Sequence, residues 1–131
     1  MTPAELRSLA ARVVVGEATD KEIALALGWK ERVHHGMFQW INPHGRVMGN
    51  VRPPRYLHSL DAADALMAPL RERGWKIDLS LRNNHYVAAH AYRQYYPDDK
   101  RHYPVQTTQS LTEAVARVAL ALLCLAAEGE R

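Results

Sequence analysis

The residues best suited to chemistry lie in the stretch "VRPPRYLHS" (residues 51–59). Two arginines, Arg52 and Arg55, flank a Pro-Pro pair, which favours the polyproline II conformation with its three residues per turn. Because the arginines are three residues apart, we expect both guanidinium groups on one side of a stiff segment. If residues 46–52 form a strand, Arg46 shares that side as well. Guanidinium groups held in this way suit a phosphate or a carboxylate.

A second loop, "RQYYPDDKRHYP" (residues 93–104), interleaves basic residues with tyrosines. This composition suits nucleotides, because the bases stack on aromatic rings while the phosphates pair with cations. The candidate ligand-binding residues are a first wall of Arg46, Arg52, Arg55 and Tyr56, and a closing loop with Arg93, Lys100 and Arg101. The alternative is that both stretches are solvated connectors, with Tyr56 packed on the first turn of the following helix.

Basic residues are concentrated in one part of the chain. The net charge is +3, but residues 28–58 hold five Lys and Arg against one acid, a local charge of +4, together with four histidines. A local basic concentration predicts an anionic partner. A nucleic-acid duplex would need a longer basic face, and Asp98 and Asp99 interrupt the second loop. We therefore expect an anionic small molecule or another protein as partner rather than a duplex.

The sequence contains no recognisable catalytic motif. There is no Gly-rich phosphate loop, no Gly-x-Ser-x-Gly and no His-Glu-x-x-His. His85 and His90 are an odd number of residues apart on a predicted strand, so they point to opposite faces and cannot share a metal ion. His90 is expected in the core, on the face of Tyr86 and Tyr92. We expect a protein that is not an enzyme and has no cofactor and no metal.

Helices are predicted from capping residues and from apolar periodicity. Their predicted starts are Pro3, the Thr19–Glu22 capping box, Ser59 and the Ser110–Glu113 capping box. The third helix should stop or kink near Met67, because the proline at position 69 would cost about 3 kcal/mol inside a helix. The last helix is apolar on nearly every side, which predicts burial against a sheet or pairing with a second copy.

Strands are predicted over Met37–Ile41, with residues 46–52 as a hairpin partner, and over a second hairpin. In that second hairpin, "WKIDLSL" alternates strictly and "HYVAAHAY" returns after an Asn-Asn turn. A two-residue turn predicts that Leu81 opposes Tyr86, Leu79 opposes Ala88, Ile77 opposes His90 and Trp75 opposes Tyr92. The large apolar face would then lie in the core, and the small face with Val87, Ala89 and Ala91 would also be covered.

Together these elements predict an α+β protein, a three-layer α/β/α sandwich with a small, mostly antiparallel sheet between helices. A chain of 131 residues fits a single domain over residues 1–131. The single cysteine, Cys124, excludes an internal disulfide and fits a reducing compartment. The N-terminus lacks a signal-peptide pattern, and the apolar run 118–127 is too short to span a bilayer, so we expect a cytoplasmic protein.

Several segments, taken in order, resemble the phage ABA sandwich domain family. They are "TDKEIALALGWK", "FQWINPHG", "PPRYLHSLDAADALM" leading through Pro69 to "GW", and "TEAVARVALALLCLAA". Together these segments are spread over nearly the whole chain. The residues that match the family pattern are mainly packing and turn residues, such as the Gly28-Trp29 and Gly74-Trp75 pairs. The resemblance implies a helix–sheet–helix sandwich and a phage or prophage gene. It implies no catalytic residue, and residues 71–73 and 95–104 depart from the family pattern.

These observations predict a non-catalytic phage or prophage accessory protein that binds an anionic, nucleotide-like small molecule. Given a phage origin, one use would be to sequester a host signal in the host cytoplasm. The alternative is a protein-interaction module that inhibits or adapts a host or virion protein through its aromatic loop surface. The sequence leaves open the ligand, the target, and whether a homodimer forms, either through the last helix or with a site that spans two copies.

Overall fold

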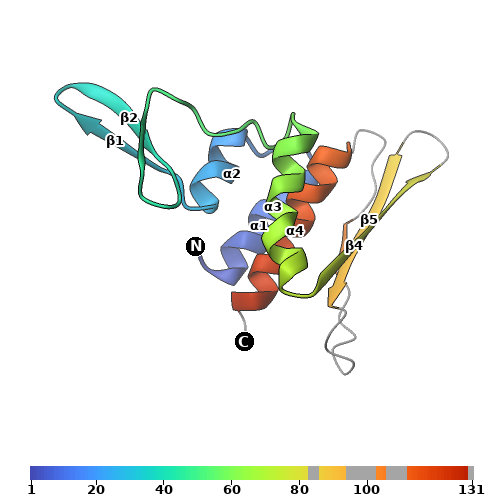
Figure 1. The fold of residues 1–131 in the computed structure, drawn as a ribbon. Coiled ribbons are helices and arrows are strands. Elements are labelled where there is room, and N and C mark those ends of the chain that lie inside the picture. The colour runs from blue at the N-terminus through green and yellow to red at the C-terminus, as the bar shows by residue number, and fades with distance from the viewer. Residues whose placement is uncertain (83–85, 94–102, 106–111, 130–131) are drawn as a thin grey trace.

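The computed structural model describes residues 1–82, 86–93, 103–105 and 112–129. It is a mixed α+β protein with four helices and two small antiparallel sheets (Figure 1). The helices are α1 (Pro3–Val14), α2 (Asp20–Ala26), α3 (Leu60–Glu72) and α4 (Glu113–Gly129). The strands are β1 (Lys30–His34), β2 (Met37–Ile41), β3 (Val47–Gly49), β4 (Trp75–Arg82), β5 (Tyr86–Arg93) and β6 (Tyr103–Val105).

Three of the predicted helix starts are confirmed by hydrogen bonds from backbone to side chain. The hydroxyl of Thr2 accepts from the Glu5 N–H, that of Thr19 from Glu22 and that of Ser59 from Ala62, each at 3.2 Å. Each cap satisfies a backbone donor that the first turn leaves free. The fourth predicted cap, Ser110, lies outside the described residues.

The prediction was that α3 stops or kinks near Met67; the helix does not stop there but continues to Glu72 with Pro69 inside it. Proline removes one backbone hydrogen bond and crowds the preceding turn. On either side of it, Met67 and Leu70 are 0% and 2% exposed, and α3 packs on α4. Burial of two large side chains, each contributing about 1.5–3 kcal/mol, offsets the cost of the proline.

Helix α4 is the centre of the core, and it packs against α1, α3 and the second sheet. Ala116 and Ala119 have no exposed surface, and the same is true of Cys124. The nearly all-round apolar surface read from the sequence is therefore covered within the chain. Within the described residues, no helix is both long and apolar enough to cross a membrane.

The first sheet has the order β1-β2-β3 and projects away from the helices (Figure 1). Its strand β1 was not predicted from the sequence. A two-residue turn, His35 and Gly36, joins β1 to β2, and both residues have positive φ, as the tight hairpin turn requires. Strand β3 is only three residues long instead of spanning 46–52, and it ends at Gly49, whose φ is +62°.

The register predicted for the second hairpin is wrong by one residue on β5. The structure pairs Arg82 with Tyr86, which leaves residues 83–85 between the strands rather than two turn residues. Leu81 therefore opposes Val87, Leu79 opposes Ala89, Ile77 opposes Ala91, and Trp75 opposes Arg93. A shift of one residue exchanges the two faces of a strand.

The exchanged faces explain how the hairpin packs on the helices. Trp75 and Ala91 are 3% and 0% exposed, so Ala91 of β5 faces the helix layer together with Trp75 of β4. His90 opposes Asp78 in the ladder instead of Ile77, and the core position predicted for its side chain lies outside the described part of the structure. The small side chain of Ala91 lets the alanine-rich helix α4 approach β5 closely.

Replacement of Pro69 by alanine should raise the free energy of unfolding. The change restores a hydrogen-bond donor at an exposed position inside α3, and we expect a gain of about 1–3 kcal/mol. Pro3→Ala is the matched control, because Pro3 lies at a helix start where proline is favourable. Urea unfolding measures both, and an equal change in the two variants would contradict this account.

Candidate functional site

The candidate site is a cavity of about 600 Å³ between the first sheet, the start of α2 and the loop that follows β3. This volume lies within the range of about 300–1,000 Å³ typical of small-molecule sites. Its lining residues are Asp20, Lys21, Phe38, Trp40, Asn50, Arg52, Pro53, Pro54 and Arg55. The Pro-Pro segment and both of its flanking arginines thus border one cavity.

Aromatic rings form one wall of this cavity. Phe38 and Trp40 are two residues apart on β2, so they share a face of the strand. Their ring centroids are 5.6 Å apart with an interplanar angle of 84°, and Trp29 packs edge-on against Trp40 at 6.5 Å. Trp40 is 8% exposed and Phe38 49%, so the wall is anchored in the core and opens to solvent at Phe38.

The cavity lining also carries three cations, two of which have acidic partners. Lys21 Nζ lies 2.8 Å from a carboxylate oxygen of Glu31. The Nε of Arg55 lies 3.8 Å from a carboxylate oxygen of Asp20. Arg52 is exposed and forms no ion pair within the part of the chain that the structure describes. Its guanidinium is the cation best placed to pair with a ligand anion.

Asp20 attaches the arginine loop to helix α2. One of its carboxylate oxygens accepts from the Leu57 N–H at 2.8 Å, and the other lies 2.9 Å from Nδ1 of His58. Within the loop, the carbonyl of Arg55 accepts from the N–H groups of His58 and Ser59 at 3.0 and 2.9 Å. Asp20 is the first residue of α2, where the helix dipole also favours a negative charge. The carboxylate therefore fixes the turn that places Arg55 on the cavity wall.

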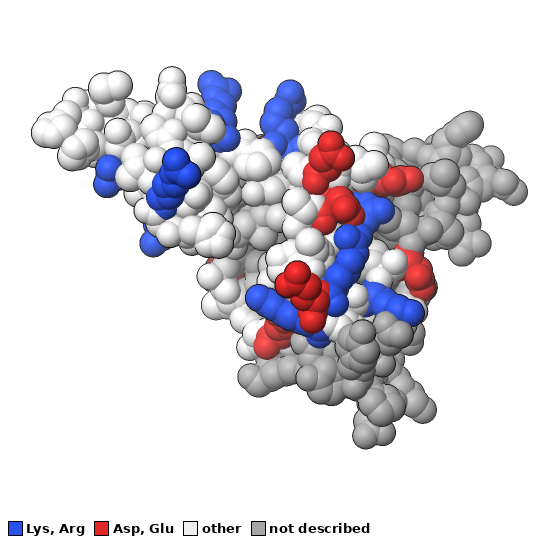
Figure 2. Space-filling view, viewed as in Figure 1, with Lys and Arg blue, Asp and Glu red and all other residues white. Residues whose placement is uncertain are grey.

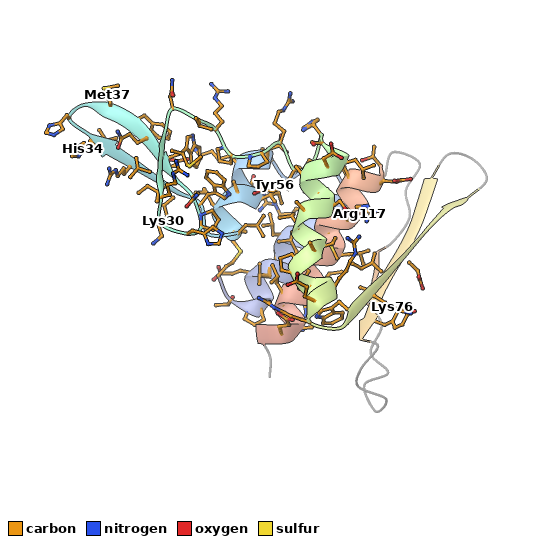
Figure 3. All side chains as sticks on the ribbon, viewed as in Figure 1. Lys30, His34, Met37, Tyr56, Lys76 and Arg117 are labelled. Atoms are coloured by element: carbon orange, nitrogen blue, oxygen red, sulfur yellow. The ribbon has the colours of Figure 1, made fainter. Side chains whose placement is uncertain are left out.

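Tyr56 does not line the cavity, although it was expected in the first wall. Its ring is 6% exposed, and its hydroxyl accepts a hydrogen bond from Trp29 Nε1 at 3.1 Å. Figure 3 shows it between the first sheet and α3. Burial raises the pKa of the Tyr56 hydroxyl, and the bond from Trp29 opposes this rise. Tyr56 joins the loop to the aromatic cluster and leaves stacking to Phe38 and Trp40.

The other expected site residues are not gathered at this cavity. Arg46 is exposed in the turn between β2 and β3, where its N–H donates to the Asn42 side chain at 2.9 Å. Because β3 begins only at Val47, Arg46 and Arg52 do not lie on one strand. Arg93 ends β5, on the far side of α3 and α4 from the first sheet (Figure 1). Lys100 and Arg101 lie outside the described residues.

The charge distribution follows the pattern read from the sequence. In Figure 2, basic side chains lie over the first sheet and the following loop without acidic neighbours in that view. Over the helices, acidic and basic side chains alternate in the same view. Within the described residues, no three His, Cys, Asp or Glu side chains gather in a way that could hold a metal ion.

Phe38 and Asp20 are among the cavity residues that were not predicted as site residues, as are Lys21, Trp40 and Asn50. The alternation in "FQW" could have indicated the shared face of Phe38 and Trp40. Nothing local could have indicated Asp20, because its partners lie 37 and 38 residues further along the chain. Comparison with profiles of known protein families, with curated proteins and with solved structures gave no match.

Replacement of Asp20 by alanine should destabilise the protein by about 1–3 kcal/mol. The change leaves the Leu57 N–H without its acceptor in a partly buried position. Asp61→Ala is the matched control, since Asp61 also lies in the first turn of a helix but is exposed to solvent. Urea unfolding of both variants measures the difference, and equal losses would show that Asp20 acts only on its own helix.

Proposed function

We propose that this cavity binds an anionic, nucleotide-like small molecule and that the protein is a non-catalytic accessory protein. The observation that carries the proposal is the juxtaposition of Arg52, which has no acidic partner among the described residues, with the open ring of Phe38. A phosphate pairs with a guanidinium, and a base stacks on an aromatic ring. The lining of the cavity offers both kinds of contact.

The electrostatics of the cavity favour one anionic group near Arg52. Lys21 and Arg55 contribute positive potential, but part of it is offset by Glu31 and Asp20. A ligand with one phosphate near Arg52 and a flat ring over Phe38 therefore matches the walls best. The Pro53-Pro54 pair limits the flexibility of the segment that carries Arg52, so little backbone entropy is lost on binding.

The resemblance to the phage ABA sandwich family belongs to the same proposal. The layer of helices against one face of the β4–β5 hairpin supports it. A three-layer sandwich would need a second layer over the opposite face, which carries the exposed Lys76 and Asp78. A phage origin would make sequestration of a host signal, in the cytoplasm of the host cell, the use of the cavity.

The proposal predicts that mononucleotides raise the melting temperature of the protein and that Arg52→Ala abolishes the effect. A ligand at one hundred times its dissociation constant stabilises the folded state by about 2.7 kcal/mol. Arg46→Ala is the matched control, because Arg46 is an exposed arginine of the same region that does not line the cavity. Phe38→Ala should weaken binding by about 1–3 kcal/mol through lost stacking.

Thermal shift and calorimetric titration with adenosine, guanosine, cytidine and uridine monophosphates measure these effects, with inorganic phosphate as a further ligand. A response to nucleotides but not to phosphate supports a site with both walls. Equal losses of the nucleotide-induced stabilisation in Arg52→Ala and Arg46→Ala would show that the stabilisation comes from general surface charge. The absence of any stabilisation at millimolar nucleotide would contradict the proposal.

A further inference from the structure

The outer edge of β1 has no partner strand among the described residues. The sheet order is β1-β2-β3, so β1 pairs with β2 along one side only. The hairpin extends away from the helices in Figure 1, and Figure 3 places His34 and Met37 at its tip and Lys30 at its base. An exposed edge of this kind presents backbone donors and acceptors to an incoming strand.

The hairpin geometry shows which backbone groups face outward. The two-residue turn is flanked by the pair His34 and Met37, which exchanges hydrogen bonds in a hairpin of this type. Hydrogen-bonded and non-hydrogen-bonded pairs alternate along an antiparallel ladder. Glu31 and Val33 therefore direct their N–H and C=O groups away from β2. An added strand would bond to these two residues.

The side chains of the edge strand differ between the two faces of the sheet. Lys30, Arg32 and His34 are exposed on one face. On the other face Val33 is 73% exposed and lies directly opposite Phe38, which is 49% exposed. One face is thus basic, and the other carries the apolar pair together with Glu31, whose charge is paired with Lys21. The edge would favour a strand in which acidic and apolar residues alternate.

We propose that the β1 edge binds an extended peptide segment of alternating acidic and apolar residues, which adds to the sheet as a fourth strand. The acidic side chains would lie over Lys30 and Arg32, and the apolar side chains over Val33 and Phe38. A second copy of the chain fits this edge less well. Antiparallel pairing of two β1 strands would bring their basic residues against one another, which is destabilising.

This surface goes beyond the nucleotide cavity and can be tested separately. Lys30, Arg32 and Val33 do not line the cavity, and only Phe38 borders both surfaces. The probe is a capped eight-residue peptide of alternating glutamate and valine with a terminal fluorophore. Fluorescence anisotropy measures its affinity, and amide shifts in a nitrogen-15 spectrum locate it. We expect the shifts to centre on Glu31 and Val33.

Two variants of the full chain test the mode of binding. Val33→Pro removes an outward N–H while keeping the pairing of β1 with β2. It should lower the affinity for the peptide at least about tenfold. The double variant Lys30→Glu/Arg32→Glu should no longer bind the glutamate–valine peptide and should bind a lysine–valine peptide instead. Lys76→Glu, an exposed lysine on a strand of the other sheet, should bind the acidic peptide like wild type.

Four results would overturn the proposal. Binding that survives both variants would place the peptide elsewhere. Equal affinity for a peptide of four glutamates followed by four valines would show charge attraction without strand addition. Self-association that Val33→Pro abolishes would make a second copy the occupant of the edge. Binding of a single-stranded oligonucleotide that competes with the peptide at β1 would make the surface a nucleic-acid site.

Discussion

The ion-paired carboxylate of Asp20 is the contact on which the cavity depends. It joins the first turn of α2 to the turn 55–58 through the Leu57 N–H and the His58 ring. Those segments are far apart in the sequence, and Pro53 and Pro54 restrict the short segment that leads into the turn. Once the turn is attached, Tyr56 reaches Trp29 in the core, and Arg52 and Arg55 border the aromatic wall. The hydrogen bond from Trp29 to Tyr56 and the carboxylate of Asp20 thus hold the arginine loop beside the aromatic wall.

The helices form most of the core, whereas the first sheet carries the proposed binding surfaces. Helix α4, surrounded by α1, α3 and the second sheet, provides most of the buried apolar surface. The first sheet is joined to this core through the ring cluster of Trp29, Trp40 and Tyr56. The rest of the β1–β2 hairpin is left exposed, with apolar and basic side chains that packing does not use. Both proposed binding surfaces lie on this part of the protein, whose residues contribute least to the core.

Local rules predicted the elements that depend on local contacts. The caps at Thr2, Thr19 and Ser59 follow from side chains that bond three residues along the chain. Long-range packing decided what was mispredicted: α3 continues through Pro69 because Met67 and Leu70, on either side of it, are buried. The β5 register was missed because the number of turn residues, which decides the face of every strand residue, was taken as two.

At the site, the three-residue spacing of Arg52 and Arg55 was readable because polyproline geometry is local, whereas the contacts of Asp20 depend on the fold. The most direct test of the cavity uses the indole N–H signals of the three tryptophans. Trp40 lines the cavity, whereas Trp75 donates to Glu128 within the helix–hairpin packing. In a nitrogen-15 titration with the mononucleotide that stabilises the protein most, the Trp40 signal should move progressively while the Trp75 signal stays in place. Movement of Trp75 with an unchanged Trp40 would contradict a binding site between Arg52 and the aromatic wall.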